Sequence, residues 1–247
     1  MGIAAALVLS LVMVPAPVAV EYVALGDSYA AGVGSGGSGG CGRSESAYPS
    51  LWKDAHVPAD FRFVACSGAT TQDVLDGQLA PLSSETTLVT LNIGGNDVGF
   101  ADVMTTCSVS SDQSCEQAVA RAGEVIRTEL PGRLDRLLGA VADKAPAAKV
   151  VVLGYPRLFE SKSCLNGLSE AKRAAVNGGA DSLATATATA AGAAGVVFVD
   201  VRDAFAGHGI CASDPWLHGL KFPVGDSYHP NKNGQVGYLK ALESALR

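Results

Sequence analysis

Five short, mostly apolar runs constrain the fold of this chain most strongly. They cover residues 20–25, 61–66, 87–93, 149–154 and 196–200. Near-continuous apolar runs of this length are typical of strands buried on both faces, as in parallel sheets. Segments with helical character separate them, so strand and helix alternate along the chain. This alternation predicts an α/β fold, a three-layer α/β/α sandwich with a central parallel sheet of about five strands.

The intervening segments predict surface helices and two loops. Helices are expected over residues 47–56, 71–79, 119–141, 168–194 and 232–246. The third of these is amphipathic, with apolar residues every three or four positions and a break near Pro131. The glycine-rich segment 32–42 predicts a surface loop. The polar segment 101–115 is expected to form a small loop closed by its two cysteines.

Length and charge narrow the class of protein. The chain has 247 residues, 48% of them hydrophobic, which is enough for one substantial core. We therefore expect residues 20–247 to form a single domain. The net charge is −6 and no basic patch occurs, so nucleic acid is not an expected partner.

The first residues resemble a targeting segment rather than part of the fold. Residues 3–14 are almost purely apolar and are followed by Pro15-Ala16-Pro17. Such a run is too short to span a bilayer and is typical of a secretory signal. The alternative is a buried first strand. We assign residues 1–19 to a signal segment and expect a secreted, extracellular protein.

The cysteine count agrees with an oxidising compartment. Six cysteines allow fifteen pairings, and an even number behind a signal-like segment favours disulfides. Chain order favours the pairs Cys41–Cys66, Cys107–Cys115 and Cys164–Cys211, because each then encloses one loop-rich region. A zinc site is the alternative, but no CxxC pair occurs. We expect neither a metal nor an organic cofactor.

Three strands end in residues suited to catalysis. The first is followed by Gly26-Asp27-Ser28, the second by Gly68 and the third by Asn96. The carboxyl ends of parallel strands share one edge of the sheet, so these residues should gather there. Ser28 supplies a hydroxyl nucleophile, and Asp27 is expected to be a cap or turn residue. The backbone N–H groups of Ser28 and Gly68 and the Asn96 side-chain amide can stabilise an oxyanion.

A serine nucleophile requires a general base, and His229 is the strongest candidate of the four histidines. It stands directly before the last predicted helix, with Asp226 three residues upstream. A short turn can bring the Asp226 carboxylate to Nδ1 of His229, which would leave Nε2 to face Ser28.

Each of these residues also has an ordinary structural interpretation. Ser28 could cap a helix, residues 94–97 could form a tight turn, and His229 could simply begin a helix. The combination favours catalysis, because chemically matched residues occur at separate positions along one expected sheet edge.

These blocks resemble a known family. Gly26-Asp27-Ser28-Tyr29, Gly68, Gly94-Gly95-Asn96-Asp97 and the segment from Asp226 to Asn231 are similar to the motifs of the SGNH (GDSL-type) esterases and lipases. The resemblance implies a flavodoxin-like fold with Ser28 as nucleophile, His229 as base, and Ser28, Gly68 and Asn96 as oxyanion donors.

A finer similarity points to secreted actinobacterial lipases and phospholipases. Residues 66–69, 153–156 and 215–218 resemble theirs, as does the three-bridge cysteine pattern, which supports the pairing above. In some of those proteins a backbone carbonyl two residues before the histidine orients it, and here that carbonyl belongs to Ser227. We favour Asp226 as the orienting group.

The sequence therefore predicts a secreted serine ester hydrolase that acts through an acyl-enzyme. Lipid and phospholipid esters are the first expected substrates, carbohydrate acetyl esters the second. A non-catalytic secreted binding protein is the remaining alternative, although all the site residues are present. We expect a monomer that makes transient contact with lipid interfaces.

Overall fold

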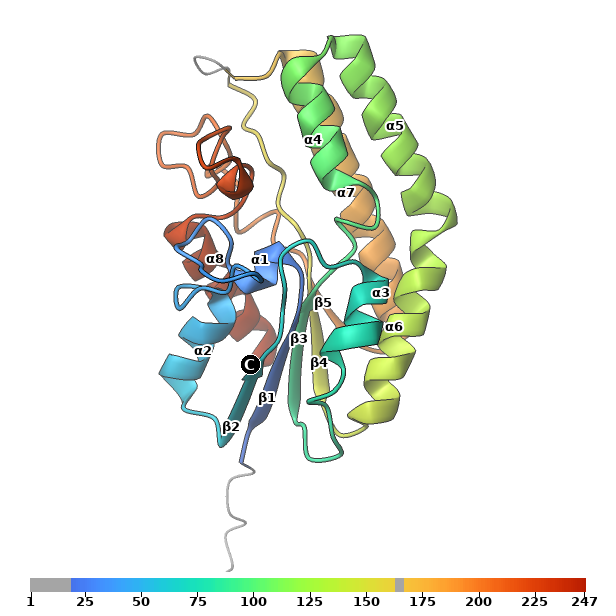
Figure 1. The fold of residues 1–247 in the computed structure, drawn as a ribbon, viewed down its shortest axis with the longest axis vertical. Coiled ribbons are helices and arrows are strands. Elements are labelled where there is room, and N and C mark those ends of the chain that lie inside the picture. Colours follow the sequence, from blue (N-terminus) through green and yellow to red (C-terminus); the bar gives the residue numbers. More distant parts are fainter. Residues whose placement is uncertain (1–18, 163–166) are drawn as a thin grey trace, which may run out of the picture.

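A computed structural model shows one parallel sheet between layers of helices (Figure 1). It describes residues 19–162 and 167–247. The strands are β1 (Glu21–Gly26), β2 (Asp60–Phe63), β3 (Leu88–Asn92), β4 (Lys149–Leu153) and β5 (Val197–Val199), in the order β2-β1-β3-β4-β5. Every neighbouring pair is parallel. The predicted fold class is confirmed.

Helices cover both faces of the sheet, with α2 and α8 on one side and α3, α6 and α7 on the other (Figure 1). The helices are α1 (Ser28–Ala31), α2 (Tyr48–His56), α3 (Thr71–Asp73), α4 (Phe100–Val109), α5 (Asp112–Thr128), α6 (Leu130–Lys144), α7 (Glu170–Ala193) and α8 (Lys232–Leu246). A π-helical turn η1 (Val74–Gln78) follows α3, and a 3-10 turn η2 (Val224–Asp226) precedes α8.

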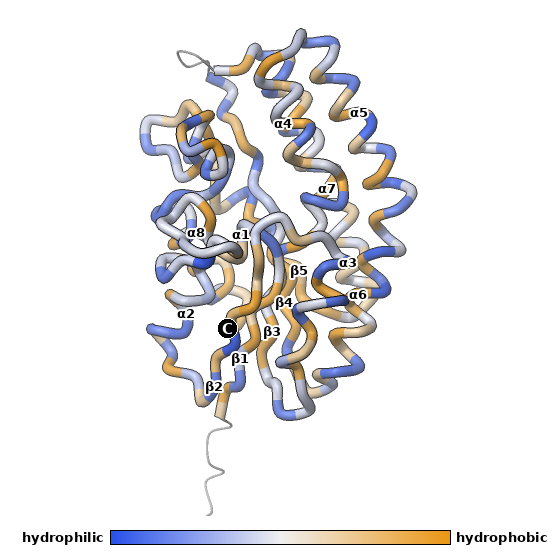
Figure 2. The backbone as a smooth tube through the Cα atoms, viewed as in Figure 1, coloured by the Kyte–Doolittle hydropathy of each residue, from blue (hydrophilic) through white to orange (hydrophobic). Residues whose placement is uncertain are grey.

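The core lies between the sheet and these layers. All five residues of β3 are buried, and so are the last five of β1. Hydrophobic colouring predominates along β3 and β4 at the centre of the sheet, whereas the long helices alternate between hydrophobic and hydrophilic residues (Figure 2). This pattern is expected when strands are covered on both faces and each helix buries one stripe.

The predicted loop over residues 101–115 is wrong. Helix α4 occupies most of this segment, and α5 begins just after Ser111, whose hydroxyl accepts a hydrogen bond from the backbone N–H of Ser114. Only Met104 and Cys107 of α4 are buried, and the other residues of the helix are partly or fully exposed, which accommodates the polar side chains of this segment. The break predicted near Pro131 is correct, since α5 ends at Thr128 and α6 begins at Leu130.

Two of the predicted disulfides are formed, Cys41–Cys66 and Cys107–Cys115. The first ties the glycine-rich loop to the segment after β2. The third predicted pair includes Cys164, which lies outside the described residues, as does most of the predicted signal segment. Within the described ranges, no helix is long and apolar enough to cross a membrane.

Candidate active site

The structure brings the sequence-predicted residues to one edge of the sheet. Ser28 follows β1, Gly68 follows β2 and Asn96 follows β3, and all three line one open pocket together with His229. His229 comes from the opposite end of the chain, just before α8. The parallel topology explains the gathering, because all carboxyl strand ends point to this edge.

A sharp turn after β1 presents Ser28. Gly26 has a φ of +127°, and a Cβ atom there would lie 2.3 Å from the carbonyl oxygen of Asn92, so only glycine fits. Asp27 is the N-cap of α1, as predicted, and its carboxylate accepts a hydrogen bond of 2.9 Å from the backbone N–H of Tyr29. Ser28 is therefore the first residue of a helix, where its own N–H is directed away from the helix body.

The buried Asp27 carboxylate also joins three strand ends. The hydroxyl of Tyr155, which follows β4, donates to Oδ2 of Asp27 at 2.5 Å. The same hydroxyl accepts a hydrogen bond of 3.2 Å from the backbone N–H of Gly95, next to Asn96. Burial raises the pKa of Asp27 to about 7, although the hydrogen bonds from the Tyr155 hydroxyl and from the backbone N–H of Tyr29 act in the opposite direction. Tyr155 thus ties the turn that carries the serine to the loop that carries Asn96.

His229 is placed to act as the base for Ser28. Its Nε2 lies 2.7 Å from Oγ of Ser28, and its Nδ1 lies 3.0 Å from the carbonyl oxygen of Ser227. A carbonyl can only accept, so Nδ1 carries the proton and the unprotonated Nε2 accepts the serine hydroxyl. Burial lowers the pKa of His229 to about 4. The ring is therefore neutral at physiological pH and can take up a proton.

The predicted contact between Asp226 and Nδ1 of His229 is wrong. The Asp226 carboxylate instead lies 3.3 Å from Nζ of Lys221. Asp226 ends the 3-10 turn η2, and this turn directs its side chain outward while the extended backbone of Ser227 presents the carbonyl to the histidine. The base is held by a main-chain oxygen, as in the second arrangement considered above.

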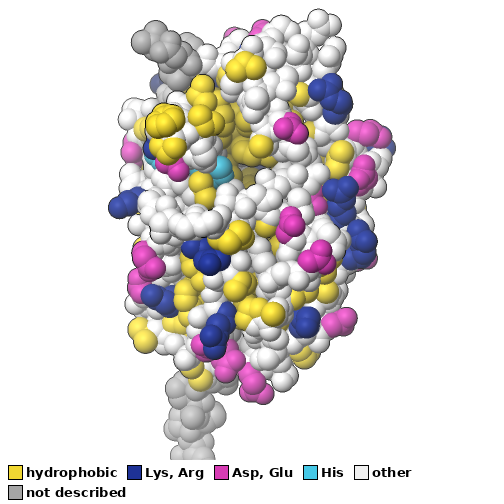
Figure 3. All heavy atoms as spheres, viewed as in Figure 1, with side chains coloured by type: hydrophobic (Ala, Val, Ile, Leu, Met, Phe, Trp, Pro, Cys, Tyr) yellow, Lys and Arg dark blue, Asp and Glu magenta, His cyan; other side chains and the backbone are white. Residues whose placement is uncertain are grey.

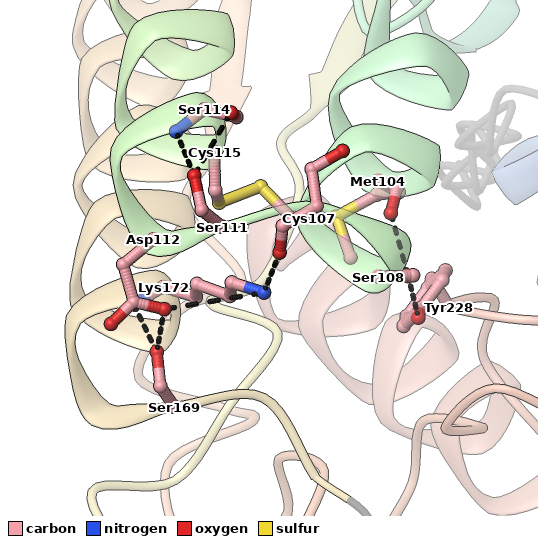
Figure 4. The surroundings of a disulfide bond; sticks show 11 residues. Met104, Cys107, Ser108, Ser111, Asp112, Ser114, Cys115, Ser169, Lys172 and Tyr228 are labelled. Carbon is pink, nitrogen blue, oxygen red and sulfur yellow. Dashed lines mark hydrogen bonds and ion pairs between the residues drawn. A yellow bond between two sulfur atoms is a disulfide. The ribbon is translucent and has the colours of Figure 1, made fainter.

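The short segment around the base is fixed at several points. Tyr228 adopts a left-handed backbone conformation, with a φ of +63°. Its carbonyl accepts a hydrogen bond of 2.7 Å from the hydroxyl of Tyr29, and its own hydroxyl lies 2.7 Å from Oγ of Ser108 on α4 (Figure 4). Ser108 is adjacent to the Cys107–Cys115 disulfide. Tyr29, the neighbour of Ser28, and Ser108, near the end of α4, therefore both help to position the segment that carries His229.

The two loops that carry the expected oxyanion donors are also tied together. Nδ2 of Asn96 donates to the carbonyl of Ala69 at 2.9 Å, which leaves its second hydrogen for another acceptor. The carboxylate of Asp97 accepts from the backbone N–H of Thr71 at 2.9 Å and from its hydroxyl at 2.6 Å. Gly68 has a φ of +82° in this loop, a conformation that favours glycine.

An apolar cavity continues inward from Ser28, between the strand ends and helices α4, α5 and α7. Its wall includes Phe100, Val103, Met104, Ile126, Val176 and Leu183. The cavity and the open pocket share Ser28, Asn96, Phe100 and Met104, so they adjoin at the nucleophile. Figure 3 shows the surface hollowed here, with hydrophobic side chains around the hollow and a histidine at its edge.

Four supporting features were not found from the sequence: the roles of Tyr29, Tyr155 and Asp97, and the apolar cavity. Tyr155 and Asp97 stand in the motifs noted above, directly after strands, and this position was the only available signal. Across residues 19–162 and 167–247, no group of three or more His, Cys, Asp or Glu side chains is placed to hold a metal ion.

A serine paired with a neutral histidine at the carboxyl edge of a parallel sheet is typical of serine hydrolases. Residues 24–236 match the model of the GDSL-like lipase/acylhydrolase family. The chain belongs to this family.

Three Streptomyces proteins are similar to this chain over nearly its whole length. Lipase 1 of Streptomyces coelicolor is 52% identical over 230 residues, which cover 91% of this chain and 86% of that protein. The crystal structure of phospholipase A1 from Streptomyces albidoflavus NA297 has a TM-score of 0.90 at 51% identity and covers 92% of this chain and 99% of its own. The extracellular lipase of Streptomyces rimosus gives a TM-score of 0.90 at 50% identity, with coverage of 92% and 100%.

Proposed function

We propose that the protein is a secreted serine hydrolase of lipid esters, acting through an acyl-enzyme on Ser28. The observation that carries the proposal is the 2.7 Å contact between Oγ of Ser28 and Nε2 of a neutral His229. A serine hydroxyl is a poor nucleophile unless such a base removes its proton. Secretion is supported by the signal-like first residues and by the extracellular relative from Streptomyces rimosus.

The proposed reaction has two halves. Oγ of Ser28 attacks the ester carbonyl carbon while Nε2 of His229 takes its proton. The negative charge that develops on the carbonyl oxygen is met by the N–H groups of Ser28 and Gly68 and by Nδ2 of Asn96. His229 then protonates the departing alcohol, and the acyl group remains on Ser28. Water attacks this ester by the same route, releases the acid and restores the serine.

The apolar cavity beside Ser28 favours substrates whose acid part is a fatty acyl chain over those whose acid part is an acetyl group. Methylene groups gain free energy when they leave water for an apolar wall, about 0.8 kcal/mol each. An acetyl group would leave most of this cavity unfilled. The names of the Streptomyces relatives, lipase and phospholipase A1, agree with acyl esters of lipids.

Labelling and a substrate series test the proposal. An organofluorophosphonate should modify Ser28, and the labelling and hydrolysis of p-nitrophenyl butyrate should be lost in Ser28→Ala. Ser67→Ala is the matched control, because Ser67 lines the same pocket but is not one of the residues that the His229 ring contacts by hydrogen bonds, which are Ser28 and Ser227. We expect kcat/KM to rise from acetyl to octanoyl esters. Unlabelled Ser28 would refute the mechanism, and a preference for acetylated sugars would support the carbohydrate esterase instead.

A further inference from the structure

Large hydrophobic side chains are exposed around the mouth of the active-site pocket. Phe222 is 90% exposed, Val109 79%, and Leu220 and Val224 65% each. Val109, Leu220 and Val224 line the pocket that contains Ser28 and His229, and Phe222 lies between the latter two in the chain. We call these four residues the apolar rim. Hydrophobic side chains gathered in this way mark a contact surface more often than isolated ones do.

The rim adjoins a mouth with almost no charge. Of the described residues that line the pocket, none is Asp, Glu, Lys or Arg. Lys221 stands within residues 220–224, which we call the rim segment, but its ammonium group is paired with Asp226. A strongly charged partner would find no complementary groups here. The surface fits a partner that is apolar and carries no net charge.

The rim is also continuous with the path that an acyl chain would follow. It borders the open pocket, which meets the inner cavity at Ser28, Asn96, Phe100 and Met104. A fatty chain that leaves a lipid layer at the rim would therefore remain against apolar side chains until its ester reaches Ser28. A docking protein would close this entrance, whereas a lipid layer would supply the substrate through it.

The rim is held at a fixed position relative to the base. The hydroxyl of Ser227 accepts a hydrogen bond of 3.0 Å from the backbone N–H of Lys221 and donates one of 3.1 Å to its carbonyl. The carbonyl of the same Ser227 orients His229. Ser227 therefore fixes the position of both the rim segment and His229, so a surface that contacts the rim lies at a defined distance from the site.

We propose that the apolar rim docks the protein onto the surface of a zwitterionic phospholipid layer, with Phe222 inserted among the acyl chains. This inference rests on the proposed lipid ester hydrolase function. Amphipathic surfaces that bind in this way gain affinity in proportion to the apolar area they bury. Because the mouth lacks charge, binding should need no anionic lipid and should depend little on salt.

Vesicle binding tests the docking separately from catalysis. The Ser28→Ala variant is sedimented with phosphatidylcholine vesicles at low and high NaCl, with and without Phe222→Ser. We expect salt-independent binding that Phe222→Ser weakens about tenfold or more, and that Phe222→Trp retains. Val57→Ser is the matched control. Val57 is 81% exposed, but it lies between α2 and β2, near the amino ends of the strands and away from the carboxyl ends that carry the site.

Activity measurements complete the test. In the otherwise intact enzyme, Phe222→Ser should leave the hydrolysis of dissolved p-nitrophenyl butyrate unchanged and lower the hydrolysis of vesicle phosphatidylcholine about tenfold. Unchanged vesicle binding, a requirement for anionic lipid, or equal loss on the dissolved ester would each overturn the docking surface. So would dimerisation that Phe222→Ser abolishes without any vesicle binding. Absent hydrolysis of the dissolved ester by the wild-type protein would instead refute the proposed function, because vesicle binding is measured without catalysis.

Discussion

Replacing Asp226 with asparagine distinguishes a main-chain partner of the base from a side-chain partner. In the structure, Nδ1 of His229 donates to the carbonyl oxygen of Ser227 at 3.0 Å, and this contact involves no atom of the Asp226 side chain. Asp226→Asn removes a charge and keeps the shape of the side chain. The tautomer and orientation of His229 should therefore be preserved, and with them the abstraction of the Ser28 proton.

The expected magnitude follows from the environment of Asp226. Its carboxylate lies 3.3 Å from Nζ of Lys221, and the two side chains are 33% and 37% exposed. Ion pairs this exposed contribute at most about 1 kcal/mol, which would correspond to a factor of about five in rate if all of it acted on the transition state. In a serine protease triad, the equivalent substitution lowers kcat about 10⁴-fold, because the histidine adopts the wrong tautomer.

The assay is kcat for p-nitrophenyl butyrate as a function of pH, with Ser28→Ala as the inactive reference. We expect Asp226→Asn to retain kcat within about fivefold. The negative charge of Asp226 raises the pKa of His229, so its removal should move the acid limb of the profile to lower pH. A drop of about 10³-fold or more in a variant of unchanged thermal stability would refute the main-chain assignment.

Three further outcomes are expected. The active form of His229 is the neutral ring, so kcat/KM should fall as the pH decreases through about 4 rather than near 6.5, as a pH profile on a dissolved ester would show. Tyr155→Phe removes the hydroxyl that donates to Asp27, so urea titrations should show a free energy of unfolding lower by about 2 kcal/mol. Rate measurements should also show a lower kcat, and an unchanged kcat would contradict a positioning role for Tyr155. Cys107→Ser with Cys115→Ser opens a bridge of sequence separation 8 and should lower the free energy of unfolding by about 2.5 kcal/mol. Hydrolysis of the octanoyl ester should fall more than that of the acetyl ester. An equal loss on both esters would show that the bridge does not support the cavity wall.

The position of the main site residues could be predicted because it depends on topology. Short apolar runs identify the strands, and parallel strands bring their carboxyl ends to one edge. Ser28, Gly68 and Asn96 each directly follow such a run, so the sequence predicts their meeting without any knowledge of side-chain packing. The sequence points to His229 through its place before the last helix and through Asp226 three residues upstream. The structure brings His229 within hydrogen-bond distance of Ser28, although Asp226 does not contact its ring.

The partner of His229 could not be found in this way. Every residue carries a backbone carbonyl, so a carbonyl that accepts a hydrogen bond has no signature in the sequence. Asp226 has the residue type and spacing of a triad member, but the 3-10 turn determines where its side chain points. Ser227, directly after that turn, is hydrogen-bonded to the backbone of Lys221 on its other side.

Helix α4 explains why the apolar cavity could not be predicted from the sequence either. Its polar composition predicted a loop, yet it places Phe100, Val103 and Met104 in the cavity wall, and its last residue, Val109, belongs to the apolar rim. It also supplies Ser108, which contacts the segment that carries the base. These contacts require α4 to be fixed against α5, and the Cys107–Cys115 bridge fixes it. The bridge that suggested a small closed loop therefore helps to hold the wall of the apolar cavity, Val109 of the rim and the segment around His229 in place.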